Sequence, residues 1–221
     1  MCNLYSMTRN REAILRLFRV AHNRAGSYEP LSAIFPGYQA PVVRKAVDGE
    51  RELVVLNWGF VLLQKDKAHK RVTNIRDDKA HSKFWRTSFE QRRCLVPASS
   101  YCEPKGEKPA TWHWFSINGD DARPVFAFPG VWTRYKGPLK KNGDTVEQEV
   151  FSFMTTEPNE LTKHQPRADA GAPYRSCRLR DVALRFNGGC VHAGAQLRSR
   201  PDAHRAVGVR AQRPARGSVV S

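Results

Sequence analysis

Residues 125–132 read VFAFPGVW, and this stretch gives the clearest indication of the fold. Aromatic and β-branched residues dominate it, as they do TWHWFSI (111–117) and EVFSFMTT (149–156). Polar segments separate the three runs, which is the pattern of strands joined by turns. Upstream, ELVVLNWGF (52–60) reads as a strand that ends at Trp58-Gly59, and RCLVPASSYCEP (93–104) reads as a strand running into a turn.

Helical patterns are fewer and lie around these strands. Arg9–Val20 has apolar residues at the one-face spacing of a helix, with Thr8 as a plausible cap. Ser82–Gln91 is expected to form a second helix. Short strands at close spacing around one or two helices indicate the α+β class, with an antiparallel, barrel-like β core and peripheral helices.

Length and composition fit a folded domain. The chain has 221 residues, of which 40% are hydrophobic and 10% aromatic. No apolar run approaches the ~20 residues of a membrane span, and the charged N-terminus does not resemble a secretory signal. We therefore expect a cytoplasmic protein with no membrane partner. The sequence says little of oligomeric state, and we take a monomer as the expectation.

The cysteines argue against a disulfide framework and against a structural zinc site. There are five of them, an odd number, and none forms a CxxC pair. Cys94, in RRCLVPA, is expected to be a small buried apolar residue. No metal or organic cofactor is implied.

The net charge of +16 favours a polyanionic partner, with nucleic acid as the first candidate. Half of this charge lies in residues 164–221, which contain 11 Arg, 3 Asp, no Lys and no Glu. This segment shows neither a helical nor a strand period. We predict two parts: a domain over 1–163, and an Arg-rich aberrant segment over 164–221 that is truncated or disordered. Such a segment could grip nucleic acid.

We hypothesise a frameshift near Lys163–His164 as the origin of the second part. Codons that encode HQPRADAGA (164–172), read one base downstream, can encode INHERMPVL. The same shift permits FETWL from 179–184 and MRIVQSGF from 202–210. All three recovered segments are protein-like and share one frame. Resequencing of the gene tests this hypothesis, and a continuous reading frame with no missing base would contradict it.

Cys2 carries the most distinctive chemistry. Removal of Met1 would leave a residue with both a free α-amine and a thiol, whose ordinary pKa values lie near ~7.7 and ~8.5. An amine condenses with an aldehyde to an imine, and the neighbouring thiol can then close a stable thiazolidine ring. The plain alternative is a small residue that happens to follow Met1.

Three other residues are candidates for the same chemistry. VTNIRDD (72–78) places Asn74 and Arg76 on one side of an extended segment, because strand side chains alternate. Arg76 is a potential bidentate phosphate ligand. Glu103 is held extended by the proline that follows it and could act as a general acid or base. Each could also be an ordinary loop or surface residue.

These motifs together resemble the SRAP family, the SOS response-associated peptidases or abasic site processing proteins. The matching pieces are, in the family's order, MCNLYSMT, NWGF, VTNIRDD, FWRTSFEQRRCLVPASSYCEP, FAFPGVW and FMTTEPNEL. They span residues 1–163. The family's closing segments resemble INHERMPVLL, FETWL and MRIVQSGF, which exist here only in the shifted frame.

The resemblance implies a protein that binds abasic sites in single-stranded DNA. After Met1 removal, Cys2 would form a thiazolidine DNA–protein crosslink that shields the lesion, and the protein would associate with the nucleoid when bound to DNA. Asn74 matches the residue that orients the opened sugar, and Glu103 matches the acid/base that also assists Met1 removal.

Other positions match the family's DNA-contacting residues. The phosphate-binding positions correspond to Arg76 and Arg86, and the DNA-facing surface corresponds to Trp58, Pro41 and Thr155. At the place of the family's histidine stand Pro166 and Arg167, so we expect crosslinking to be impaired in this chain.

Two other functions remain open at this point. One is a cysteine-type peptidase or N-terminal nucleophile hydrolase that acts on proteins, since Cys2, Glu103 and a histidine could support acyl transfer. The other is a nucleic-acid-binding module without chemistry, which the basic charge alone would allow.

Overall fold

The computed structural model describes residues 2–65, 68–105, 111–117 and 123–156, with the short pairs 185–186 and 189–190. Apart from those two pairs, the predicted Arg-rich segment 164–221 lies outside the described residues, as do Pro166 and Arg167. The prediction that this segment is truncated or disordered therefore stays a prediction.

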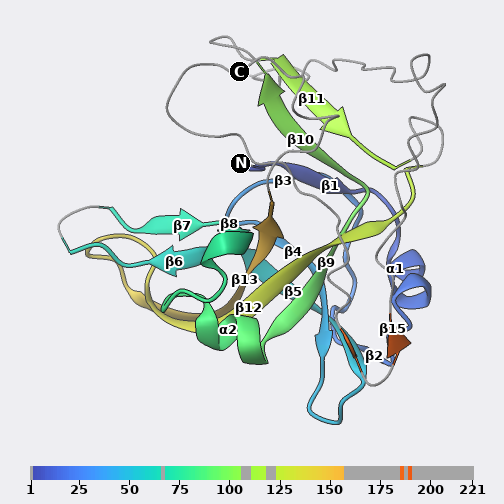
Figure 1. Cartoon of the computed structure of the whole chain (residues 1–221), viewed down its shortest axis with the longest axis horizontal. Helices are drawn as coiled ribbons and strands as arrows, with labels where there is room; N and C mark the ends of the chain where they lie inside the picture. The colour runs from blue at the N-terminus through green and yellow to red at the C-terminus, as the bar shows by residue number, and fades with distance from the viewer. Residues whose placement is uncertain are drawn as a thin grey trace, which may run out of the picture.

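A closed barrel of five strands forms the centre of the molecule (Figure 1). Its strands follow the order β5-β4-β9-β12-β13, and the ring closes because β13 also pairs with β5. The pairs within the ring are antiparallel except for this closing one, which is parallel. The prediction of an α+β protein with a mostly antiparallel barrel is confirmed.

The elements are β1 (Tyr5–Met7), α1 (Arg11–Leu17), β2 (His22–Asn23), β3 (Leu31–Ile34), β4 (Gln39–Lys45), β5 (Arg51–Trp58), β6 (Phe60–Leu62), β7 (Lys70–Val72), β8 (Asn74–Arg76), the 3-10 helix η1 (Asp77–Lys79), α2 (Arg86–Gln91), β9 (Arg93–Ala98), β10 (Ser100–Lys105), β11 (Thr111–Phe115), β12 (Phe126–Pro138), β13 (Thr145–Thr155), β14 (Arg185–Phe186) and β15 (Gly189–Cys190).

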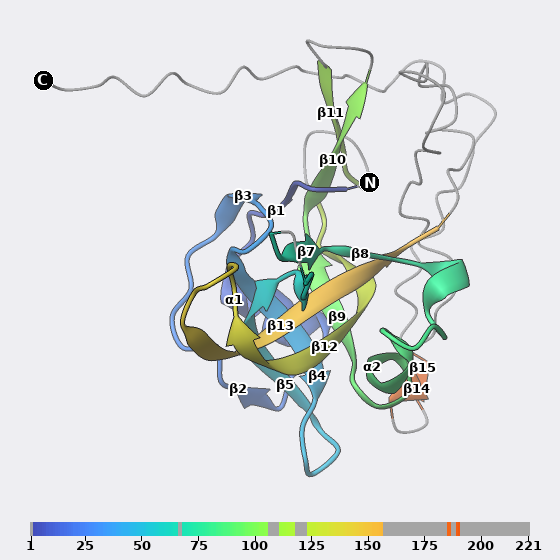
Figure 2. The same cartoon turned by 90° about the vertical axis from the view of Figure 1, so that its left-hand side faces the viewer.

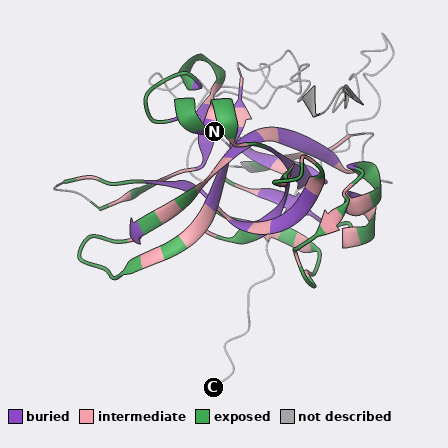
Figure 3. Ribbon diagram, turned by 90° about the horizontal axis from the view of Figure 1, so that it is seen from below, coloured by how far each residue is buried: buried purple, intermediate pink, exposed green. Residues whose placement is uncertain are grey.

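Four aromatic rings fill the barrel. Phe128 and Phe153 stack with centroids 4.5 Å apart, and Trp58 stacks on the other side of Phe153 at 5.2 Å. Tyr5 meets Trp58 edge to face at 5.0 Å. All four residues are fully buried, and Figure 3 shows the buried segments concentrated on the barrel strands. Two of the aromatic-rich runs of the sequence, 125–132 and 149–156, therefore contribute core strands, whereas TWHWFSI forms β11 of the second sheet.

A second sheet rises from one end of the barrel, in the order β11-β10-β1-β3 (Figure 2). The sequence predicts a turn after RCLVPA, but the chain bends at Ser99 and continues directly into β10. Ser99 Oγ lies 3.1 Å from Ser6 Oγ, and Ser6 Oγ lies 2.6 Å from Ser100 Oγ. These buried hydroxyls tie β1 to the start of β10, and the first residues of the chain thus lie beside β10.

Both helices are shorter than the sequence indicates. Helix α1 begins at Arg11, and its cap is Asn10 rather than Thr8, because the Asn10 side-chain oxygen accepts from the backbone N–H of Ala13 at 3.1 Å. The Thr8 hydroxyl instead donates to Ser99 Oγ at 3.1 Å. Helix α2 begins at Arg86, after a turn that starts at Ser82.

Cys2, Cys94 and Cys102 are free and buried, which confirms the expectation for Cys94. Within the described ranges, no three His, Cys, Asp or Glu side chains gather as a metal site would require. Across those same residues, no helix has the length and apolar character needed to cross a membrane.

Close packing at Gly130 gives a test of the barrel. A methyl group there would lie 2.8 Å from the Ser152 carbonyl oxygen and 3.2 Å from Cys94 Sγ, so β12 and its neighbours would have to separate. We expect Gly130→Ala to lower the free energy of unfolding by about 1–3 kcal/mol, measured by denaturant titration. Gly143→Ala, where the nearest atom would be 3.3 Å away in a turn, is the matched control. Equal stability of the two variants would contradict this packing.

Candidate active site

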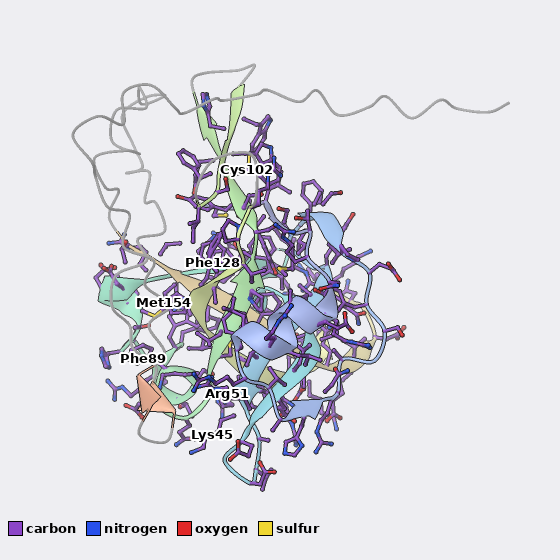
Figure 4. All side chains as sticks on the ribbon, turned by 90° about the vertical axis from the view of Figure 1, so that its right-hand side faces the viewer. Lys45, Arg51, Phe89, Cys102, Phe128 and Met154 are labelled. Carbon is purple, nitrogen blue, oxygen red and sulfur yellow. The ribbon has the colours of Figure 1, made fainter. Side chains whose placement is uncertain are left out.

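Cys2 lies in the N-terminal arm just before β1, against the base of β10. Its side chain is fully buried, and its thiol donates to the Leu4 carbonyl oxygen at 3.4 Å. The same oxygen accepts from the backbone N–H of Cys102 at 2.9 Å. Figure 4 shows Cys102 where the second sheet leaves the barrel, above Phe128. The pairing of β1 with β10 therefore delivers Cys2 to one end of the barrel.

Asn74 holds the arm from the other side. It begins β8, and its Nδ2 donates to the Cys2 carbonyl oxygen at 2.8 Å and to Thr73 Oγ1 at 2.9 Å. Thr73 Oγ1 in turn donates to Asn3 Oδ1 at 3.2 Å. The sequence analysis did not single out Thr73 or Asn3, and only their long-range contact with each other identifies them.

The side-chain oxygen of Asn74 is an exception to this network. Asn74 Oδ1 is buried and has no hydrogen-bond partner among the residues that the structure describes. A buried acceptor without a partner costs about 1–3 kcal/mol. Asn74 Oδ1 can therefore accept a hydrogen bond from a hydroxyl or amine group that enters the site.

Glu103 supplies the carboxyl group of the site. It lies on β10 and is 6% exposed. Burial raises the pKa of Glu103, and the positive charge of the chain's α-amino group partly opposes that rise. A carboxyl group with a raised pKa holds its proton to higher pH than an ordinary glutamate and is a stronger base when ionised.

The Cys2 thiol shares the same environment. Burial, followed by the negative charge of Glu103, raises the pKa of Cys2 to about 12. The thiol is therefore protonated at neutral pH and needs a base, or a change of surroundings, before it can attack. Glu103 interacts electrostatically with Cys2, and Asn74 donates a hydrogen bond to the Cys2 carbonyl oxygen. The structure therefore brings these three predicted residues together from the N-terminal arm, β8 and β10.

The two predicted phosphate ligands lie at the surface. Arg76 ends β8 two positions after Asn74, and its side chain is 41% exposed. It forms a two-point ion pair with Asp78, with Nε–Oδ1 at 2.8 Å and Nη2–Oδ2 at 2.6 Å. Arg86 is exposed at the start of α2, and its Nε donates to the His81 carbonyl oxygen at 3.2 Å.

Trp58, Pro41 and Thr155, which the resemblance matches to a DNA-facing surface, are all buried in this structure. The Trp58 ring is part of the aromatic core, and its Nε1 donates to the Thr73 carbonyl oxygen at 3.1 Å. Pro41 lies within β4 opposite Val55 in the barrel wall. Thr155 ends β13, where its hydroxyl donates to the Ile75 carbonyl oxygen at 3.4 Å. Trp58 and Thr155 thus support the segment that carries Asn74.

Comparison with solved structures shows the same fold in two bacterial proteins. One is a protein from Bordetella bronchiseptica, with a TM-score of 0.58 and 20% identity, over 76% of this chain and 80% of that one. Another is a protein from Bacteroides thetaiotaomicron, with a TM-score of 0.54 and 22% identity, over 74% of this chain and 72% of that one. No match is found among curated proteins.

The family comparison covers the part of the chain that builds the barrel and the site. The model described as "SOS response associated peptidase (SRAP)" matches residues 1–166. That range ends close to the boundary at 163 predicted from composition. The chain belongs to the SOS response associated peptidase (SRAP) family.

Proposed function

We propose that this chain is a DNA-binding protein of the DNA-damage response that captures abasic sites in single-stranded DNA through Cys2. The observation that carries the proposal is the convergence of Cys2, Asn74 and Glu103 at one end of the barrel. An amide, a carboxyl group with a raised pKa and a potential 1,2-aminothiol are the groups that covalent capture of an aldehyde needs. The family and the net charge of +16 agree with a DNA partner.

Removal of Met1 must come first, because the Cys2 nitrogen is an amide while Met1 is attached. Glu103 is close to this end of the chain, since its negative charge acts on the Cys2 thiol. It can take a proton from an attacking water and pass one to the leaving amine. This step is the peptidase activity that we assign to the chain.

Capture then proceeds in two bond-forming steps. The freed amine of Cys2 adds to the aldehyde carbon of the opened sugar, and loss of water gives an imine. Protonated Glu103 donates the proton that the departing hydroxyl needs, the nitrogen releases one proton to water as the imine forms, and Glu103 is later reprotonated from solvent. The thiol sulfur then adds to the imine carbon while its proton passes to the nitrogen, which closes the thiazolidine ring. The balance is one aldehyde and one aminothiol converted to one ring and one water.

Asn74 orients both partners in this scheme. Its Nδ2 fixes the Cys2 carbonyl group, and its unpartnered Oδ1 can accept from a sugar hydroxyl. Holding the two reacting groups in contact removes much of the entropic cost of bringing them together. Arg76, at the outer end of the same strand, is suited to a neighbouring phosphate once its ion pair with Asp78 opens.

Substitution of Cys2 tests the covalent step. We expect wild-type protein without Met1 to give a heat-stable shifted band with abasic single-stranded DNA on a denaturing gel. Cys2→Ala should lose this band, because no thiol remains to close the ring. Cys94→Ala, which removes another buried thiol from the barrel, should keep it.

The same assay separates the competing functions. Cleavage of added peptides without a shifted band would support a protein-directed peptidase. Salt-sensitive DNA binding without a covalent band would support a binding module with no chemistry. Retention of the heat-stable band in Cys2→Ala would overturn the proposal.

The ion pair at Arg76 gives a second test, of non-covalent binding. Arg76→Ala should weaken binding of single-stranded DNA by about tenfold and reduce the salt slope by about one phosphate contact. Asp78→Asn should strengthen binding several-fold, because it frees the guanidinium and removes a negative charge. Arg134→Ala, at an exposed site on β12, is the control. Titrations at several salt concentrations measure all three, and equal effects of Arg76→Ala and Arg134→Ala would contradict a specific role for Arg76.

A further inference from the structure

The hairpin of β10 and β11 carries a histidine that the scheme above does not use. His113 lies on β11 directly opposite Glu103 on β10 in an antiparallel ladder. Residues that face each other in this way project from the same side of the sheet, with Cβ atoms about 4.5–5.5 Å apart. An imidazole ring at that separation is within reach of the carboxyl group.

A neighbouring pair confirms which residues share a face. Two positions along each strand, Tyr101 lies opposite Phe115, and their rings stack with centroids 5.1 Å apart and an angle of 18° between planes. Side chains two residues apart on a strand point the same way. Glu103 and His113 therefore continue the row that the Tyr101–Phe115 stack begins. The alternate pair, Cys102 opposite Trp114, projects from the other face.

Exposure differs across the Glu103–His113 pair. Glu103 is buried, whereas His113 is partly exposed to solvent. Other titratable groups that interact electrostatically with Glu103 are the Cys2 and Cys102 thiols and the α-amino group. His113 is therefore the more solvent-accessible member of the pair.

A buried carboxyl group that donates a proton must recover it before the next step. Direct contact with water is restricted at a residue that is 6% exposed. Histidine is the side chain whose ordinary pKa, near ~6.5, lets it take up and release protons at neutral pH. A partly exposed imidazole beside the carboxyl group can therefore carry protons between that group and water.

From this juxtaposition, we propose that His113 is a positioning residue that relays protons between Glu103 and solvent. The inference rests on the proposed function of Cys2 and Glu103. When Glu103 gives its proton to the departing hydroxyl group, the imidazolium of His113 returns one to the carboxylate. The neutral imidazole then takes a proton from water.

The experiment compares two histidine-to-glutamine variants of the full chain. His113→Gln should lower the rate of crosslinking to abasic single-stranded DNA about tenfold or more, while binding of the same DNA, measured without crosslinking, changes less than twofold. His22→Gln is the matched control. His22 lies on β2 and pairs with Asp48, at the far end of the barrel from β11 (Figure 1), and this variant should leave both quantities unchanged.

Chemical rescue separates proton transfer from a structural role. We expect added imidazole to restore at least part of the crosslinking rate of His113→Ala and to leave Glu103→Gln unaffected, because a free base can replace the relay but not the carboxyl group. A slow His113→Ala variant that imidazole does not rescue would overturn the proton relay. A His113→Gln variant that crosslinks at the wild-type rate would do the same. Absence of crosslinking in the wild-type protein would instead contradict the proposed function itself.

Discussion

The parallel pairing of β13 with β5 and β8 is the constraint on which the rest of the structure depends. Its contacts with β5 close the barrel, at Val150 opposite Asn57 and Phe151 opposite Trp58. A few residues further along, the same strand pairs with β8, with Phe153 opposite Asn74. Strand β13 therefore closes the barrel around the aromatic core and also positions the Asn74 amide that hydrogen-bonds to Cys2 in the N-terminal arm. Because the strands of a closed barrel hold one another in place, the residues at its end are held in fixed relative positions.

Two groups of buried polar side chains show how the molecule separates stability from chemistry. In the barrel wall, Arg44 is 12% exposed and its charge is matched: it forms ion pairs with Glu52 at 2.6 Å and Glu149 at 2.9 Å, and its guanidinium lies 4.0 Å from the Trp132 ring centroid. A buried charge is tolerated there because partners surround it.

At the N-terminal arm, the buried polar groups are less fully paired. Asn74 keeps an unpartnered oxygen, and burial raises the pKa values of both Cys2 and Glu103. Such features reduce stability and are typical of sites where chemistry is performed. The hydroxyl cluster of Ser6, Ser99 and Ser100 compensates for part of this cost, because it anchors the arm without any charge.

The sequence by itself determined what depends on local pattern. Alternation and aromatic content identified the strands, Gly59 marked the end of β5, and the spacing within VTNIR placed Asn74 and Arg76 on one side of a strand. Only the tertiary structure decided which side of each strand faces inward, because that depends on partners far along the chain. Trp58 and Thr155 looked like surface residues by resemblance, yet barrel closure buries them. The meeting of Glu103 with Cys2, and of Glu103 with His113, likewise depends on the register between strands. A local pattern fixes the direction of a side chain relative to its own strand, whereas register is set by packing across the whole barrel.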